Sequence, residues 1–249
     1  VIKYSISFAF RKKYNTIFID KKLNHELKKG EPFIYFPLQL EPERTIQVPA
    51  PYYTNQLEVI RNIAKSIPIG YRLCVKEHPA QKLNGWRSSS FYKEILKMPN
   101  VEMYHPSISN NIMIENCELV ITITGTSGFE AVINQKPAII LANTTYSQIS
   151  AVYQLKNFGE LSTSIKKMLK VKPKLEEIIN YTKMIEPEIF EHEEYGLDMK
   201  ICSYFYYNGF LFDNDIHLSK MKSFLKENEL EFEKLAFEYD KKIKKYKIN

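Results

Sequence analysis

The sequence predicts an α/β fold built on a parallel β-sheet, and two observations carry that prediction. Between residues 31 and 172, short apolar runs rich in β-branched residues alternate with segments whose apolar residues recur at helical spacing. Such runs are typical of strands buried on both faces, and strands separated by helices form parallel sheets. Beyond about residue 172 the apolar pattern is helical only, so we expect a helical carboxyl-terminal region after the sheet.

Strands and helices follow from this pattern in chain order. Gly30-Glu-Pro32 separates the first segment from the first strand, and Pro68-Ile-Gly70 ends the first helix that follows it. Thr54 is expected to cap that helix. The expected strands are residues 33–38, 71–76, 100–104, 119–124 and 138–142. The expected helices are residues 54–67, 88–98, 109–116, 127–135 and 161–169.

The chain divides into three predicted regions. Residues 1–30 mix aromatic residues with lysine and arginine, and we expect a helix and a linker there, outside the core and at the end of a missing or truncated amino-terminal domain. Residues 31–172 form the predicted sheet domain, and residues 173–249 form the helical region. The lysine-rich run at residues 241–247 is expected to be a solvated end, with contact to anionic lipid as the alternative.

Composition limits the classes of partner. The net charge of +6 favours anionic ligands such as nucleotide phosphates, acidic glycans or anionic lipid, but it is too modest and too dispersed for nucleic acid. Cys74, Cys117 and Cys202 lack the spacing of metal ligands and are expected to be reduced thiols. No apolar run is long enough to cross a bilayer, and no signal peptide is visible. We therefore expect a cytoplasmic protein.

One stretch gives the strongest indication of a ligand site. The apolar run 119–124 breaks into Thr124-Gly-Thr-Ser-Gly128 and continues as a helical pattern. A strand, a turn of Gly, Thr and Ser, and a helix present backbone N–H groups and a positive helix end to an anion. The alternative is that Ser127 and Glu130 form a capping box, which only satisfies backbone amides. The stretch matches neither the Walker A loop nor the dinucleotide-binding fingerprint.

Polar loops follow three of the predicted strands, at residues 39–44, 76–79 and 124–130. Ligands of parallel sheets bind at the carboxyl ends of the strands, so we expect the three loops to meet at one site. His78 in the second loop and Ser127 in the third should therefore converge on one ligand, although they are far apart in the sequence.

The residues of these loops resemble a known family. Phe36-Pro-Leu-Gln-Leu-Glu-Pro-Glu43, Lys76-Glu-His-Pro79, Thr124-Gly-Thr-Ser-Gly-Phe-Glu-Ala131 and Lys136-Pro137 resemble, in order and rough spacing, the capsule polysaccharide biosynthesis proteins. That family includes Kdo transferases of bacterial surface glycans, which have the two-domain GT-B architecture. The resemblance covers residues 31–170 and implies a Rossmann-like, nucleotide-sugar-binding domain. A similar histidine-proline and hydroxyl pattern occurs in some bacterial sialyltransferases and in CDP-glycerol glycerophosphotransferases.

All of these families use cytidine-nucleotide donors. The resemblance thus implies a glycosyltransferase, or its donor-binding domain, that moves a sugar such as Kdo from CMP to a bacterial surface polysaccharide or glycolipid. Such an acceptor implies peripheral contact with the inner face of the cytoplasmic membrane. The alternatives are a CDP-glycerol-type glycerophosphotransferase and a non-catalytic nucleotide-binding module. Because no Asp-x-Asp metal motif is present, we expect a metal-independent reaction without a cofactor.

The resemblance also implies roles in donor binding. His78 would donate to the donor's phosphate, most strongly as a cation, and Thr126 and Ser127 would hold that phosphate from the other side. Glu130 would accept hydrogen bonds from the ribose hydroxyls, and Lys76 would add positive charge. The implied donor-contacting residues are Gln39, Lys76, His78, Pro79, Thr124, Gly125, Thr126, Ser127, Gly128 and Glu130.

The reacting centre needs a carboxylate. It would either take the proton of the acceptor hydroxyl or attack the sugar as a nucleophile. The resemblance places an acidic residue near Glu43, which is therefore the expected catalytic residue, and Glu41 is its competitor. His78 is expected to act in catalysis as well as in binding, because charge builds on the phosphate that it contacts.

Overall fold

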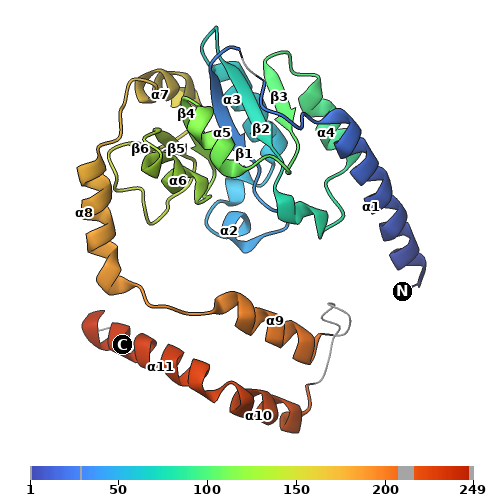
Figure 1. Ribbon diagram of the computed structural model, residues 1–249, viewed down its shortest axis with the longest axis vertical. Coiled ribbons are helices and arrows are strands. Elements are labelled where there is room, and N and C mark those ends of the chain that lie inside the picture. Colours follow the sequence, from blue (N-terminus) through green and yellow to red (C-terminus); the bar gives the residue numbers. More distant parts are fainter. Residues whose placement is uncertain (1, 29, 207–215, 247–249) are drawn as a thin grey trace. The chain divides into compact units, whose positions relative to one another are not determined.

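The computed structural model describes residues 2–28, 30–206 and 216–246, and Figure 1 shows their helices and strands. The chain forms two compact units, residues 1–183 and residues 184–249. The first unit contains the whole sheet, and the described residues of the second unit form helices and their connections.

A parallel sheet of six strands forms the centre of the first unit. The strand order is β3-β2-β1-β4-β5-β6, which is the order of the doubly wound, Rossmann-like fold. The strands are β1 (Phe33–Pro37), β2 (Arg72–Lys76), β3 (Val101–Tyr104), β4 (Leu119–Thr122), β5 (Ala138–Ile140) and β6 (Val152–Gln154). The predicted fold class and its five strands are confirmed. The sequence pattern does not predict β6. This strand has only three residues, of which one is buried, so it lacks the apolar run that marks the central strands.

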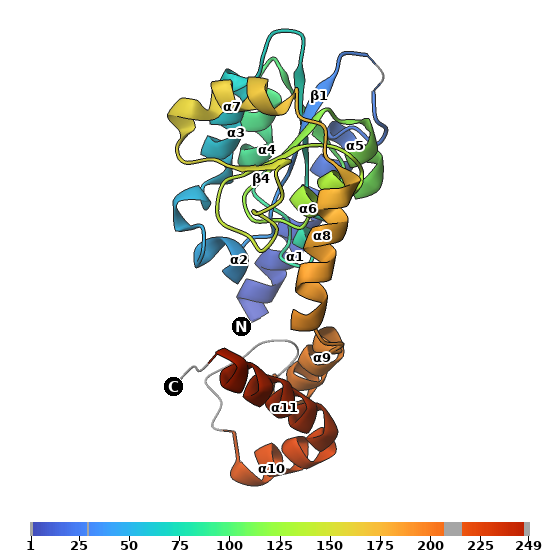
Figure 2. The same cartoon turned by 90° about the vertical axis from the view of Figure 1, so that its left-hand side faces the viewer.

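Helices cover both faces of the sheet, and Figure 2 shows the two groups on opposite sides. On one face, α3 (Gln56–Ser66) packs against α4 (Ser89–Leu96) and α7 (Leu161–Met168). On the other face, α5 (Asn110–Asn116) packs against α6 (Ser127–Ile133). The remaining helices of this part of the chain are α1 (Ile2–Lys22), the single turn α2 (Arg44–Gln47) and α8 (Leu175–Ile185).

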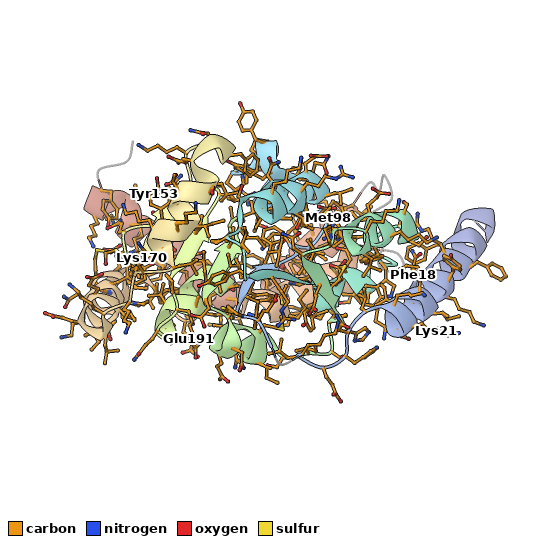
Figure 3. All side chains as sticks on the ribbon, turned by 90° about the horizontal axis from the view of Figure 1, so that it is seen from above. Phe18, Lys21, Met98, Tyr153, Lys170 and Glu191 are labelled. Carbon is orange, nitrogen blue, oxygen red and sulfur yellow. The ribbon has the colours of Figure 1, made fainter. Side chains whose placement is uncertain are left out.

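The core follows from the patterns that predict the strands and helices. All five residues of β1 are buried, as a central strand with helices on both faces requires. In α3, Val59, Ile60 and Ile63 recur at helical spacing and are buried against the sheet. Each such side chain contributes about 1.5–3 kcal/mol on burial. Figure 3, seen from above, shows side chains filling the space on both sides of the sheet.

Two expectations from the sequence are wrong. Asn55 rather than Thr54 caps α3, because the helix begins at Gln56 and the Asn55 side chain accepts the amide of Glu58 at 3.3 Å. Residues 1–30 do not stay outside the core, because Ile19 and Leu23 are buried in it. The neighbouring lysines of this segment are exposed, and they make the segment polar on average. The helix nevertheless has one apolar face, which packs into the core.

The cysteines are free thiols. Cys74 and Cys117 are buried, and burial raises the pKa of each to about 12. Cys202 is partly exposed. The prediction of reduced core thiols is confirmed for Cys74 and Cys117, and their raised pKa values make them unreactive near neutral pH.

In the second unit, the described helices pack around aromatic side chains. The helices are α9 (Glu194–Phe205), α10 (Leu218–Glu227) and α11 (Glu229–Tyr246). Phe224 is buried, and its ring lies 4.9 Å from that of Phe205 and 6.1 Å from that of Phe232. This cluster holds residues of all three helices together, and the predicted helical carboxyl-terminal region is confirmed in the part that the structure describes.

The lysine-rich run at the end of α11 forms ion pairs within its own unit. Lys242 and Lys245 both pair with Glu188, and Lys244 pairs with Asp240 at 2.6 Å. Residue 247 of this run lies outside the described residues. Within the described ranges, no helix is long and apolar enough to cross a membrane.

Candidate functional site

A cavity of about 520 Å³ lies at the carboxyl ends of β1, β2 and β4. The three loops that the sequence singles out, 39–44, 76–79 and 124–130, meet there, and the loop at residues 106–110 forms a fourth wall. The cavity lies beside the point where the strand order reverses, between β1 and β4. Open α/β sheets bind their ligands at this point, so this cavity is the candidate site.

Most of the predicted site residues line this cavity. They are Gln39, Glu43, Lys76, His78, Pro79, Thr124, Gly125, Thr126, Ser127 and Glu130. Glu41 lines a second cavity on the other side of its loop, and Gly128 is buried in the first turn of α6. The structure therefore brings the predicted residues together, apart from these two, while their roles stay predictions.

Lys76 is the last residue of β2, and only 6% of its surface is exposed. Burial lowers the pKa of its ammonium group, and the carboxylates of Glu130 and Glu77 oppose that shift from a distance. Among the described residues, no group forms an ion pair or hydrogen bond with this ammonium. The ammonium of this largely buried side chain meets the cavity without a protein partner, and an anionic ligand in the cavity would supply that partner.

His78 follows β2, and its Nδ1 accepts the backbone N–H of Ala80 at 3.2 Å. In the neutral ring the proton then lies on Nε2, which remains available as a donor. Burial lowers the pKa of His78, although the carboxylates of Glu77 and Glu43 oppose the shift. The ring is therefore neutral at pH 7, so the geometry favours a neutral donor over the cation that the sequence suggests.

The turn between β4 and α6 does not form the capping box that the sequence allows. β4 ends at Thr122, two residues earlier than expected, and α6 begins at Ser127 after the N-cap residue Thr126, whose side chain caps no amide. The carboxylate of Glu130 instead accepts the hydroxyl of Thr126 at 2.9 Å. Ser127 and Glu130 therefore present their polar atoms to the cavity rather than to the backbone of the helix.

The two glycines of this turn allow close packing. A Cβ on Gly125 would lie 2.7 Å from Nε2 of Gln39 and 2.8 Å from Oγ1 of Thr122, which is too close for any real Cβ. A Cβ on Gly128 would lie 2.6 Å from the hydroxyl oxygen of Tyr146. The Tyr146 hydroxyl donates to the carbonyl of Gly125 and so helps to fix the turn. Gly128 thus makes room for a supporting side chain rather than for a ligand.

The sequence pattern does not identify Asn110, which lines the cavity at the start of α5. Its Nδ2 donates to Glu130 at 2.6 Å, and its Oδ1 accepts the hydroxyl of Tyr35 at 2.7 Å. The position of Asn110 in the sequence is the one signal that could have identified it. The polar segment from Ser107 to Asn110 follows the third predicted strand, and the carboxyl end of that strand lies at the same edge of the sheet.

Glu43 and Glu41 belong to one loop but have different surroundings. Glu43 precedes α2 and lines the cavity, and within the described residues its carboxylate has no hydrogen bond or ion pair. Glu41 pairs with Arg87 and accepts a hydrogen bond from Gln56. The structure thus leaves Glu43 free to act in the cavity and ties Glu41 to the surrounding framework.

Arg87 is a second residue that the sequence pattern does not identify. Its guanidinium contacts the carboxylate of Glu77 at 3.0 Å, the carboxylate of Glu41 and the carbonyl of Gln39. Glu77 is fully buried and also accepts the backbone N–H of His78 at 2.7 Å. Arg87 therefore fixes the loop that carries Glu43 relative to the loop that carries His78. These partners come from separate segments, so no local spacing predicts the cluster.

The chemistry of the lining suits phosphates and hydroxyls. Across the described part of the chain, no three His, Cys, Asp or Glu side chains gather closely enough to hold a metal ion. The cavity instead offers one ammonium, one neutral imidazole, several hydroxyls and three carboxylates, of which that of Glu77 is paired with Arg87. Ammonium, imidazole and hydroxyl groups donate to phosphate oxygens, and carboxylates accept from sugar hydroxyls.

Solved structures with a similar fold include sugar transferases of low sequence identity. The β-Kdo 2,7 transferase of Thermosulfurimonas dismutans KpsC is 18% identical, with 71% of this chain and 53% of that chain covered and a TM-score of 0.44. The β-Kdo 2,4 transferase of the same KpsC is 11% identical, with 70% and 62% covered and a TM-score of 0.42. The spinosyn rhamnosyltransferase SpnG is 14% identical, with 65% and 43% covered and a TM-score of 0.40.

The chain thus spans 53% and 62% of the lengths of the two KpsC structures. Comparison with curated proteins gives no match. The family model of the capsule polysaccharide biosynthesis proteins matches residues 2–184, which include every residue that lines the cavity. A match over this much of the chain shows that the protein belongs to the capsule polysaccharide biosynthesis protein family.

Proposed function

We propose that the chain is the donor-binding part of a glycosyltransferase and that the cavity binds a cytidine nucleotide sugar. The observation that carries the proposal is the convergence of Lys76, His78 and Ser127 on one cavity at the carboxyl edge of the sheet. Its volume of about 520 Å³ suits a ligand of this size. Membership of the capsule polysaccharide biosynthesis family supports an acceptor of the polysaccharide or glycolipid class.

Three groups would contact the donor's phosphate. Lys76 supplies a positive charge, and the Nε2–H of His78 and the hydroxyl of Ser127 supply directed hydrogen bonds. Negative charge builds on the phosphate as the sugar leaves, and donors fixed in advance stabilise that charge without reorganising. Thr126 contributes less than the sequence suggests, because its hydroxyl hydrogen is directed to Glu130.

The charge of the lining favours a donor with a single phosphate. Within the described residues, Lys76 is the one lysine or arginine that lines the cavity, whereas Glu43, Glu77 and Glu130 all line it, and only Glu77 has a cationic partner, Arg87. The phosphate of a CMP-linked sugar carries one negative charge, and the pyrophosphate of a UDP-sugar or CDP-glycerol carries two. A second phosphate charge would lie near these carboxylates with no second lysine or arginine in the lining to offset it. We therefore favour a CMP-linked donor over CDP-glycerol. Kdo is the first candidate because the loops resemble those of Kdo transferases, and not because of this count, since the carboxylate of Kdo adds a negative charge of its own.

Glu43 is the proposed reacting group. Its carboxylate lines the cavity near His78, where its charge acts on the pKa of the ring. It would take the proton of the acceptor hydroxyl or, as a nucleophile, form a glycosyl-enzyme that the acceptor then releases. Peripheral contact with the inner membrane surface would bring a glycolipid acceptor to this carboxylate.

Calorimetric titration with CMP, CDP and UDP tests the proposal. CMP should bind more tightly than either diphosphate, and Lys76→Gln should weaken CMP binding by about 10-fold to 100-fold, as expected for loss of a charged hydrogen bond. Lys82→Gln is the matched control, because it removes the same charge from an exposed position outside the cavity. A folded protein that binds none of the three nucleotides would overturn the proposal.

A further inference from the structure

A chain of hydrogen bonds lies at one end of the cavity, and the proposed contacts with phosphate and ribose do not by themselves explain it. Tyr35 donates its hydroxyl to Oδ1 of Asn110 at 2.7 Å. Nδ2 of Asn110 lies 2.6 Å from Oε2 of Glu130 and 3.4 Å from Oγ of Ser127. Thr126 donates to the other carboxylate oxygen of Glu130 at 2.9 Å. All five residues line the cavity.

The direction of each hydrogen bond follows from the chemistry of the groups. Tyr35 is fully buried, and burial raises the pKa of its hydroxyl, which therefore keeps its proton and donates. The oxygen of the Asn110 amide must face that donor, so its nitrogen faces Glu130. This orientation is consistent, because a carboxylate accepts hydrogen bonds and an amide nitrogen donates them.

The remaining N–H of Asn110 decides how Ser127 is used. It points to the serine oxygen, which accepts from it. A hydroxyl that accepts on one side keeps its own hydrogen for another partner, and here that hydrogen is left for an acceptor in the cavity. Meanwhile both oxygens of Glu130 are held by protein donors, which fixes the carboxylate but leaves lone pairs for the hydroxyls of a ligand.

We infer that Asn110 is a positioning residue of the donor site, which directs the Ser127 hydroxyl to the phosphate and fixes Glu130 as an acceptor for the ribose. This inference rests on the proposed function. Ser127 then acts as a donor and Glu130 as an acceptor, although they lie three positions apart on one helix. The ligand must then place an acceptor at Ser127 and a donor at Glu130, as a phosphate beside a ribose does.

Aspartate is the most informative replacement, because it has the shape of asparagine without its donors. In Asn110→Asp, the new carboxylate accepts the hydroxyl of Ser127 and so turns its hydrogen away from the phosphate. The same carboxylate faces Glu130, and two carboxylates that close together repel unless they share a proton. The variant therefore reverses the polarity of the network with little change in volume.

The matched control is Asn111→Asp, which adds the same charge at the next residue, on an exposed position outside the cavity. CMP binding, measured by calorimetry, should weaken by about tenfold or more in Asn110→Asp. The control should stay within about twofold of the wild-type protein. Equal losses in the two variants would overturn the inference.

A pH series separates positioning from a merely structural role. As the pH falls, the new carboxyl and Glu130 should come to share a proton, because two carboxylates so close together repel, and the protonated carboxyl donates as the amide did. The affinity of Asn110→Asp relative to wild type should therefore recover as the pH falls from about 7.5 to about 5.5. Asn111→Asp should show no such recovery, and a pH-independent deficit in Asn110→Asp would contradict the inference.

A double-mutant cycle tests whether Asn110 acts through Ser127. In the Ser127→Ala background, Asn110→Asp should cost much less CMP affinity than it costs in the wild-type protein. Equal costs in both backgrounds would refute the coupling. If Asn110→Asp does not fold, Asn110→Ser replaces it in the cycle, since it retains one donor. Failure of the wild-type protein to bind CMP would refute the proposed function instead, so the two failures are distinguishable.

Discussion

Arg87 and Lys76 are both nearly buried cations at the carboxyl edge of the sheet, yet their surroundings differ. Arg87 is 7% exposed and contacts two carboxylates and a carbonyl. Lys76 is 6% exposed, and none of the described residues offers it a direct partner. A buried charge is tolerated when it is compensated, so Arg87 belongs to the framework. Lys76 is the cation whose compensation we expect from a ligand.

The same division separates the two carboxylates of one loop. Glu41 lies on the side of Arg87 and forms an ion pair with it, whereas Glu43 lies on the side of Lys76 and faces the cavity. Residues two positions apart therefore have different partners, and we expect them to have different roles. Glu41 and Glu43 have the same chemistry. Their hydrogen-bond and ion-pair partners distinguish the supporting residue, Glu41, from the candidate reacting residue, Glu43.

The largest effect should come from Glu43. Glu43→Gln should lower the rate of sugar transfer by about 100-fold to 10,000-fold, because a positioned base or nucleophile is removed. CMP affinity should change little. The rate of transfer from CMP-Kdo to an acceptor glycan is the measurement, and Glu41→Gln is the comparison within the same loop. A larger loss of transfer in Glu41→Gln than in Glu43→Gln would reverse the assignment of the two sides.

Removal of the Arg87 charge should strongly destabilise the fold. Arg87→Met should lower the free energy of unfolding by about 3–5 kcal/mol, because the fully buried carboxylate of Glu77 is left without its cation. Urea denaturation measures the change. Arg61→Met is the control, since its ion pairs with Glu58 and Glu94 are partly exposed to solvent and should contribute about 0–1 kcal/mol. Similar losses in both variants would show that the Arg87 cluster does not support the fold.

Lys76→Met should behave in the opposite way. Without a ligand, its free energy of unfolding should be unchanged or higher, because a partly desolvated charge without a protein partner has been replaced by an apolar side chain. With CMP present, the stabilisation that the ligand gives to the wild-type protein should be largely lost. Thermal denaturation with and without CMP measures both. A loss of unliganded stability as large as that of Arg87→Met would remove the contrast between the two cations.

The smallest effect should come from His78 and should depend on pH. Burial holds the pKa of the folded-state ring below its ordinary value of 6.5. The contribution of the neutral ring to stability is therefore complete above about pH 6.5 and is lost as the pH falls through the lowered folded-state value. His78→Gln lacks this titration, so its stability relative to wild type should improve between about pH 7 and about pH 5. A constant difference across that range would contradict the neutral, half-buried ring.

The fold was predictable because its pattern is local. Alternating apolar runs specify the central strands, and β1 and β4 are buried along their whole length as that pattern requires. The edge strand β6 and the buried residues Ile19 and Leu23 were not predictable in the same way. A three-residue strand is too short for a periodic pattern, and the lysines around Ile19 and Leu23 make the apolar face of that helix hard to recognise.

The candidate site was predictable only in part. Loops that follow parallel strands must meet at one edge of the sheet, so the meeting of His78 and Ser127 follows from strand positions alone. The contacts of Asn110 with Tyr35 and Glu130 join residues 75 and 20 positions apart. Such pairings depend on packing in three dimensions. For the same reason, the sequence did not show that Arg87 ties Glu41 while Glu43 stays free.

The close approach of Gly125 to Gln39 has a consequence for how this protein can change. No larger residue fits at position 125 while Gln39 keeps its place, because the new carbon would overlap the amide of that side chain. The amide in turn donates to Thr122 at 3.2 Å, so moving it breaks that hydrogen bond, and Oγ1 of Thr122 would itself lie 2.8 Å from the new carbon. A larger residue at position 125 therefore requires changes at positions 39 and 122 as well.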